Sequence, residues 1–393
     1  MYSRPLFGVD IFLNNIGEMG DTVMKIRMSY LRMTAIAVLA AGLVGCGGGG
    51  GGDGGPAIPT ASNAAITPPP TTSVAIATGA QTTNTTIAAA AFQAVNGAGL
   101  QTIGNIPSLA GVAVTPTATE TRRLMIAEIV RRHAEKIKDY MGSAPVAGAQ
   151  IVQTVPCFSG TETLVVDDMN GNFSQIFVNC DEGGVIFHGT ISSTGVSANV
   201  TLGSTVGSSY NISVTATITI DLSITTASPA AVLVSQGSFT FSVTSSGTMQ
   251  DDGFGGLRPV GVTTIVIAGP SLLASDGVNR EQLSNFALTV VDDDVTGATT
   301  INSGSHFTYA NSASAISGAV TVNITTPIHY ASLALDPDAG VIEITTTASL
   351  GKIKVTFSSS TTTPVTVDVY ANAADASPTN TYTLTWVQFD ALI

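Results

Sequence analysis

The chain has 393 residues, of which 44% are hydrophobic and only 10% are charged, and its formal net charge is −13. A chain of this length and apolar content can bury a sizeable core, which excludes a wholly disordered protein. After Gln150 only four Lys and Arg accompany 19 Asp and Glu. This part therefore lacks the cationic surface that binding to nucleic acid or to an anionic membrane requires.

A basic start, an apolar run and a cysteine follow one another between Lys25 and Cys46. This order is typical of a secretory signal, and the apolar run over residues 33–44 is too short to span a bilayer. Residues 1–45 are therefore interpreted as a signal peptide region. The acidic residues before Val23 are unsuited to the front of an export signal, so Met24 or Met28 is predicted to be the true start.

The last residues of this region, Leu43-Val44-Gly45-Cys46, resemble the lipobox of bacterial lipoproteins. The resemblance implies cleavage before Cys46 and acylation of its thiol with fatty acids such as palmitate. Gly47 is not acidic, which by the same resemblance is compatible with the outer membrane. The alternative is a free or disulfide-bonded cysteine after an ordinary signal.

Residues 46–117 are predicted to be a disordered tether. Eight glycines lie between positions 47 and 55, and sequence rich in Ala, Thr and Pro continues to about Thr117. Glycine cannot offset its ordering entropy through side-chain contacts. A flexible coil of this length has a root-mean-square reach of roughly 50 Å, which would let the folded part stand clear of the lipid.

An amphipathic helix is predicted over residues 118–142. Thr117 and Glu120 match a capping box, apolar residues from Ile126 to Met141 recur at three- and four-residue steps, and Gly142 provides a stop. This segment holds six of the 14 Lys and Arg of the chain. Docking of its apolar stripe onto a sheet is favoured over binding to an anionic membrane. His133, beside the stripe, is interpreted as a structural or surface residue.

The remainder, residues 150–393, is predicted to form one antiparallel β domain. Tyr210 to Thr226 alternates apolar and polar residues without a break, and the alternation resumes at Phe239 after a turn, which indicates a long hairpin. The fold class is thus mainly β: a large antiparallel meander with one amphipathic helix, preceded by a disordered tether. A sandwich, a strongly curved sheet around the helix, and a barrel remain open.

Cys157 and Cys180 are predicted to form a disulfide. They flank two strand-like runs joined by Asn170-Gly171, a strong hairpin signal that would bring the sulfurs together. In an exported protein a loop of this size stabilises the fold by roughly 3 kcal/mol. Two buried free thiols are the alternative.

The pattern around these cysteines is similar to that of a group of uncharacterised bacterial lipoproteins with Gly-rich tethers. It comprises Cys157-x-Ser159-Gly160-Thr161, Asp168-x-Asn170-Gly171-Asn172, Asn179-Cys180 and Tyr382-x-Leu384-x-Trp386. The resemblance implies no activity and no catalytic residue.

No catalytic residue, metal ligand or cofactor is predicted. Asp168, Asn170 and Asn172 have the spacing of a calcium loop, but Phe173 replaces its glycine and Asn179 its bidentate glutamate, so a hairpin tip explains them better. The acidic residues 251–252 and 292–294 are interpreted as solvated turns that could at most hold calcium weakly.

His188, His306 and His329 lie far apart in sequence without a zinc motif, and a Gly-x-Ser-x-Gly elbow is absent. We therefore expect a non-enzymatic, lipid-anchored protein of the bacterial cell envelope, which contacts the membrane through Cys46 and no nucleic acid. Its β domain would be structural, adhesive or bind an unknown protein, glycan or lipid. The alternative is a carrier of a lipid or other hydrophobic ligand in a curved-sheet cavity. A carbohydrate-active enzyme is a third, weaker expectation, because paired carboxylates are recognised only in three dimensions.

Overall fold

A computed structural model describes residues 58–99, 151–167, 172–181, 184–227, 230–251, 257–275, 277–278, 280–312, 317–331, 334 and 336–392. Its elements are α3 (Gln81–Gly99), β1 (Ile151–Pro156), β2 (Ser159–Asp167), β3 (Asn172–Asp181), β4 (Val185–Thr201), β5 (Ser209–Ala227), β6 (Ala230–Asp251), β7 (Leu257–Ser275), β8 (Arg280–Asp293), β9 (Ala298–Ile301), β10 (His306–Asn311), β11 (Gly318–Tyr330), β12 (Ala339–Thr345), β13 (Lys352–Ser358), β14 (Val365–Tyr370), β15 (Asn380–Leu384) and α5 (Trp386–Asp390).

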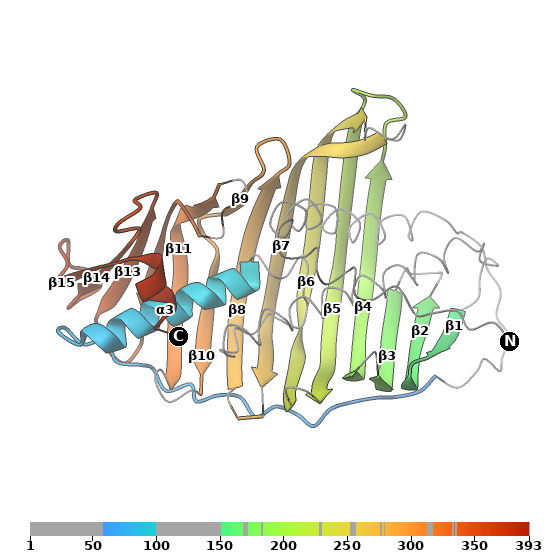
Figure 1. Ribbon diagram of the computed structural model, residues 1–393, viewed down its shortest axis with the longest axis horizontal. Helices are drawn as coiled ribbons and strands as arrows, with labels where there is room; N and C mark the ends of the chain where they lie inside the picture. The colour runs from blue at the N-terminus through green and yellow to red at the C-terminus, as the bar shows by residue number, and fades with distance from the viewer. Residues whose placement is uncertain are drawn as a thin grey trace, which may run out of the picture.

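All fifteen strands belong to one antiparallel sheet (Figure 1). Each strand pairs with the next along the chain, except that short β9 packs at the ends of β8 and β11 while β10 lies between those two strands. Among the described strands, β1 and β15 are the two edges. The predicted fold class, a large antiparallel meander, is confirmed, and of the open architectures it is the curved sheet that forms.

Alternating side chains give the sheet two different faces. In β5, Ile218, Ile220 and Leu222 are buried, whereas Thr219 between them is exposed. The predicted long hairpin is confirmed, because β5 and β6 pair without a register shift from Ser209 opposite Thr248 to Ala227 opposite Ala230. The period of two along β5 therefore places its apolar side chains on one face.

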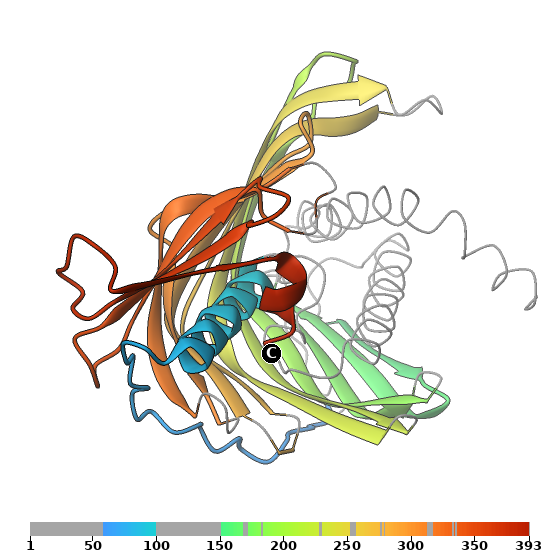
Figure 2. The same cartoon turned by 60° about the vertical axis from the view of Figure 1, so that its left-hand side comes forward.

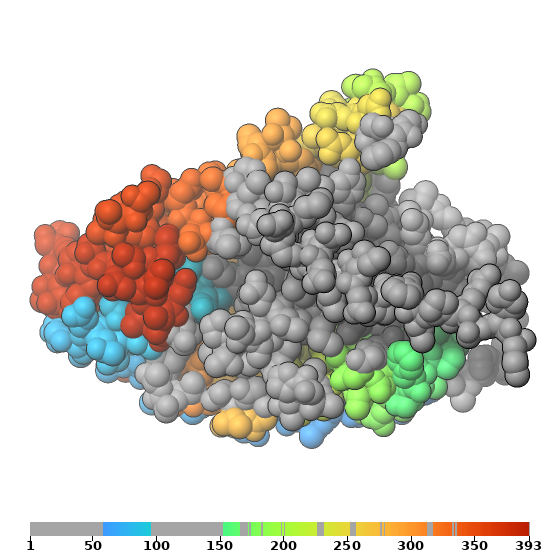
Figure 3. Space-filling model, in the orientation of Figure 1, coloured from blue at the N-terminus to red at the C-terminus, as the bar shows by residue number. Residues whose placement is uncertain are grey.

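The sheet curves strongly, and α3 lies inside the curve (Figure 2). We call the apolar side that faces α3 the concave face and the opposite, polar side the convex face. The longest strands, β4 to β7, extend beyond their neighbours at one end. Figure 3 shows the tips of the hairpins β4–β5 and β6–β7 projecting from the rest of the described chain.

An extended segment, residues 58–80, crosses the convex face before it enters α3; we call it the strap (Figure 1). Asn63 fixes its first part: the backbone N–H donates to Asp221 Oδ2 (3.1 Å), and Nδ2 donates to the carbonyl oxygen of His188 (3.1 Å). Thr190 donates its hydroxyl to the carbonyl of Ala61 (3.0 Å). Gly189 has a φ of 124°, and a Cβ at this position would clash with Asn63 and Asp221.

The second part of the strap rounds the ends of the strands. Ser73 of the strap pairs with Ala319, near the start of β11, in an isolated parallel bridge. The N–H of Ala319 donates to the carbonyl of Thr72 (3.0 Å). The N–H of Gly79 donates to Asn380 Oδ1 in β15 (3.1 Å). Ile76 is buried in the main core. The strap thus connects β4 with β15 from outside the sheet.

The strap and α3 show that part of the tether predicted over residues 46–117 is ordered; residues 46–57 and 100–117 lie outside the described residues. Residues 58–99 are ordered, because the strap satisfies its polar groups on the convex face and the run of alanines around Ala89 to Ala91 favours a helix that packs closely against the sheet. The predicted helix over residues 118–142, with His133, lies outside the described residues, as do residues 1–57.

Candidate functional site

The concave face carries the main apolar cluster of the described residues and is the candidate site. Its side chains come from β3 to β8 and from β10 to β14 and form one cluster of buried residues with α3 and α5. Val243, Ile265, Leu288, Val322, Ile344 and Val355 are among its members. Such a concave apolar face is suited to packing against a chain segment or to enclosing a hydrophobic ligand.

One end of the concave face is filled by an aromatic cluster. Phe92 of α3 lies 4.6 Å from Phe357 of β13, 5.7 Å from Trp386 and 5.8 Å from Phe389, measured between ring centroids. Trp386 and Phe389 belong to α5, which begins with a capping box between Thr385 and Gln388. These contacts fix α3 over the C-terminal strands, and its other main sheet contacts are with β8, β12 and β14.

A buried polar cluster joins β8 and β10 on the same face. The Tyr309 hydroxyl donates to Glu281 Oε1 (2.9 Å), and Asn311 Nδ2 donates to the same oxygen (2.9 Å). Glu281 is only 4% exposed. Burial raises the pKa of Tyr309 well above its ordinary value, and the charge of Glu281 adds to this effect. The hydroxyl therefore stays protonated and acts as a donor.

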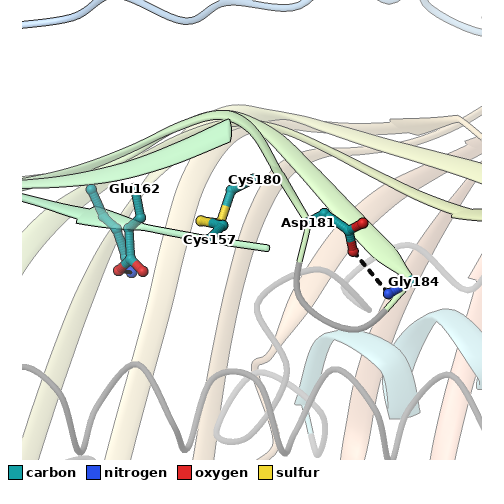
Figure 4. The surroundings of a disulfide bond; sticks show 6 residues. Cys157, Glu162, Cys180, Asp181 and Gly184 are labelled. Atoms are coloured by element: carbon teal, nitrogen blue, oxygen red, sulfur yellow. Dashed lines mark hydrogen bonds between the residues drawn. A yellow bond between two sulfur atoms is a disulfide. The ribbon is translucent and has the colours of Figure 1, made fainter. Parts of the chain in front are cut away.

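A second buried carboxylate lies on β2, near the opposite edge of the sheet. Glu162 is 4% exposed, and its Oε1 accepts a hydrogen bond from Gln175 Nε2 (2.7 Å). Glu162 lies directly opposite Phe177 in the pairing of β2 with β3, and paired residues point to the same face of a sheet. Because Phe177 belongs to the main core, the Glu162 side chain is on the concave face. Figure 4 shows Glu162 pointing away from the side on which the strap runs.

The predicted disulfide between Cys157 and Cys180 is confirmed, with the two Cα atoms 5.4 Å apart. It lies beside the register shift between Phe177 and Cys180 in β3, and it joins the connection between β1 and β2 to β3 (Figure 4). The hairpin that was expected to bring the sulfurs together forms, since Asp167 pairs with Asn172. The residues of its tip, 168–171, lie outside the described residues.

The three histidines of the β domain are separated in the structure, as in the sequence. His188 is in β4, His306 is in β10, and His329 in β11 contacts Asp338, with Nδ1 and Oδ1 2.6 Å apart. Within the ranges that the structure describes, no three His, Cys, Asp or Glu residues group as a metal site would need.

The acidic turn after β8 uses its carboxylates locally. Asp293 accepts hydrogen bonds from the N–H of Val295 (2.8 Å) and the hydroxyl of Thr296 (2.9 Å), which lowers its pKa. Burial raises the pKa of neighbouring Asp294. Asp251 ends β6, and Asp252 lies outside the described residues. These contacts explain the turn without a bound ion.

Asp390, the last residue of α5, and Asp336 are exposed acids whose charges interact. Burial raises the pKa of Asp336 in the loop before β12, and burial together with the charge of Asp336 raises the pKa of Asp390. Burial and Asp336 also raise the pKa of Tyr330. Like charges that face one another in this way favour protonation of one partner.

The structure therefore brings together residues that sequence reasoning did not select. Glu281, Tyr309 and Asn311 are far from any motif, and only the pairing of β8 with β10 across the inserted β9 places them side by side. Cys46, the predicted lipidation site, lies outside the described residues. Neither α3 nor α5 combines the length and hydropathy that crossing a bilayer needs.

Comparison with known proteins leaves the class of protein open. No protein-family model, no curated protein and no solved structure matches the chain.

Proposed function

We propose that the protein is a lipid-anchored component of the bacterial cell envelope whose β domain is structural, adhesive or partner-binding. The observation that carries the proposal is the Cys157–Cys180 disulfide, because such bonds persist in oxidising compartments outside the cytoplasm. It agrees with the secretory pattern before Cys46 and with the lipobox-like residues 43–46. Gly47 favours the outer membrane over the inner one.

The projecting hairpins support a partner-binding role. Leu202 and Val206 at the β4–β5 tip are 56% and 63% exposed, and Leu257 at the start of β7 is also exposed. Exposed apolar side chains at the end of a long projection are suited to contact with another macromolecule. We assign no reaction to the domain.

The anchor is tested by Cys46→Ser in the full chain produced in a bacterium. We expect the variant to lose incorporation of a palmitate analogue and to move from the membrane fraction to the soluble fraction. Gly49→Ala, in the glycine run, is the matched control and should remain acylated. A serine variant that stays equally membrane-bound, with no lipid label on either protein, would remove the basis of the proposal.

A carrier of a lipid or other hydrophobic ligand is the second candidate, because the concave face is apolar and strongly curved. Native mass spectrometry of the Cys46→Ser protein after gentle purification distinguishes the two. A co-purifying lipid favours the carrier, whereas a consistently ligand-free mass favours a packed domain.

A further inference from the structure

One end of the sheet lies beside the strap, and we call it the strap end. It comprises the connections β1–β2, β3–β4, β5–β6 and β7–β8, because every second connection of an antiparallel meander returns to the same side. Figure 1 shows the strap running along the ends of these strands. Strands β4 to β7, with 17 to 22 residues each, separate this end from the projecting hairpins by about 55–75 Å. The two ends can therefore meet different partners.

Large apolar side chains face solvent at the strap end. Phe158 between β1 and β2 is 85% exposed, and Val278 between β7 and β8 is 82% exposed. Ile186 near the start of β4 and Val232 near the start of β6 are 37% and 41% exposed. Both lie opposite Thr225 of β5 in the ladder, so they point to the same face. The exposed apolar side chains thus extend over about six strand spacings, or about 28 Å.

The strap adds an uncharged border to this end. Its residues 58–80 include no Asp, Glu, Lys or Arg. Two charged side chains beside it have partners within the protein: Asp181 Oδ1 accepts from the N–H of Gly184 (2.8 Å), and Arg280 Nη1 donates to the carbonyl of Thr67 in the strap (3.4 Å). Among the described residues, the strap end therefore presents mainly apolar and uncharged groups to solvent.

The attachment of the strap relates this end to the lipid anchor, so the inference rests on the proposed acylation of Cys46. The strap is first fixed where Ala61 accepts a hydrogen bond from Thr190 of β4 (3.0 Å). Along β4 this point is about 13 Å from Ile186 at the strap end and about 40 Å from Leu202 at the hairpin tip. A flexible coil of the length that separates Cys46 from Ala61 has a root-mean-square reach of about 20 Å. That reach covers the first distance and falls short of the second.

We propose that the strap end is the surface on which the β domain rests against the lipid bilayer that anchors it. Phe158 and Val278 enter the interfacial layer of the bilayer, with Ile186 and Val232 at its edge, because apolar side chains gain free energy there by leaving water. The anchor keeps this surface at a high effective concentration near the lipid, so that no cationic patch is needed. The projecting hairpins then point away from the bilayer, where a partner can reach them.

The proposal is tested with the full chain on vesicles of phosphatidylcholine, which carries no net charge and does not repel the acidic domain. An environment-sensitive fluorophore is attached at Val278→Cys, while Cys157 and Cys180 remain in their disulfide. The matched control is Val206→Cys, which places the fluorophore at the exposed hairpin tip. We expect the fluorophore at position 278 to brighten several-fold on the vesicles and to be quenched by nitroxide-labelled lipid. At position 206 it should keep the spectrum that it has in solution.

Two ways of attachment separate this proposal from the proposed anchor. In the first, the chain is acylated at Cys46; in the second, a Cys46→Ser chain with a hexahistidine tag directly before position 46 is held by nickel-chelating lipid. Brightening of the tagged chain, with no vesicle binding by the untagged chain, would overturn acylation and support the lipid-facing surface. An unchanged fluorophore at position 278 on the vesicle-bound tagged chain would overturn the lipid-facing surface, whether or not Cys46 is acylated.

Substitutions in the surface itself give a second test. Phe158→Asp combined with Val232→Asp should abolish most of the brightening at position 278, while the tagged chain stays on the vesicles. Val266→Asp, at an exposed position in the middle of β7, is the matched control and should leave the brightening unchanged. All three side chains are exposed, and hydrogen exchange of β5 checks that the sheet remains folded.

Other occupants of the strap end give different results. Brightening at position 278 that appears without lipid and grows with protein concentration would identify a second copy of the chain as the occupant and overturn the proposal. Equal brightening at positions 278 and 206 on the vesicles would also overturn it, because the bilayer would then not distinguish the two ends of the sheet.

Discussion

Tyr309 is one of the residues that hold the buried carboxylate of Glu281 in place. Its hydroxyl donates to Glu281 and accepts a hydrogen bond from Asn311 Nδ2 at 2.7 Å. Because the three side chains come from two strands, their hydrogen bonds link β8 and β10 beside the backbone pairing of Asn311 with Glu281. Losing one member leaves buried polar atoms with fewer partners.

Tyr309→Phe removes only this hydroxyl. We expect the free energy of unfolding to fall by about 1–3 kcal/mol, because the desolvated Glu281 and Asn311 lose a hydrogen-bond partner. Urea denaturation measures the effect. Tyr382→Phe on the edge strand β15 is the control, with an expected change of about 0.5 kcal/mol or less. Equal stability of the two variants would show that the cluster does not contribute.

Asp390 gives the fold a pH dependence. Burial and the charge of Asp336 raise its pKa in the folded state, so the folded protein binds this proton more tightly than the unfolded chain does. The tighter binding of this proton stabilises the folded state. This stabilisation is fully present below the unfolded-state pKa of Asp390 and is lost as the pH rises through its folded-state pKa. The ionised pair therefore weakens the packing of α5 at neutral pH.

Asp390→Asn should remove this unfavourable charge. We expect a gain in stability at pH 7 of about 0.5 kcal/mol or less, since the residue is partly exposed to solvent. The gain should disappear below about pH 4, where the wild-type carboxyl is protonated. Thermal unfolding between pH 3 and pH 8 measures both. A gain of the same size at pH 3 would contradict the electrostatic explanation.

At the scale of elements, the strap and α3 hold the sheet from opposite faces. The strap is attached by hydrogen bonds to side chains of the polar face, such as Ile66 N–H to Gln236 Oε1 at 2.7 Å. Helix α3 is attached by apolar packing of Phe92 and Ile87. One continuous segment therefore ties β4 to β15, which are far apart in the sheet.

Asn63→Ala should loosen the first part of the strap without unfolding α3. The Nδ2 group of Asn63 bonds His188 and Asp221, and we expect the loss to weaken the local fold by about 1–2 kcal/mol. Hydrogen exchange should quicken at residues 58–67 and stay slow in α3, which the aromatic cluster holds separately. The exposed neighbour Ser62→Ala is the control. If both variants exchange alike, the side chain of Asn63 does not hold the strap.

At the scale of the whole molecule, the sequence predicted the sheet better than the parts that cross it. Strands such as β5 are recognisable because their alternation must match a face that is buried on one side only. The Cys157–Cys180 pair was recognisable because local hairpin pairing determines it. Both depend on residues that are near in sequence.

The strap and the Glu281 cluster could not be predicted, because their partners are distant in sequence. Residues 58–80 look like low-complexity chain, and their order comes from side chains such as Asp221 and Gln236 that lie more than 150 positions away. The helix α3 had a signal, the alanine run with Ile87 and Phe92. The surrounding Ala and Thr residues mask its pattern, so the sequence alone assigns this run to the tether.

The strap has a consequence for how the protein would stand on a membrane. If Cys46 carries the lipid, only the short stretch up to Ala61 separates the acyl chains from a point fixed on β4 and β5. Fifteen residues reach at most about 50 Å when fully extended. The segment between the lipid and the strap is thus far shorter than a tether running to Thr117 would be. The β domain would stay beside the bilayer that anchors it, and its partners would have to come within that radius.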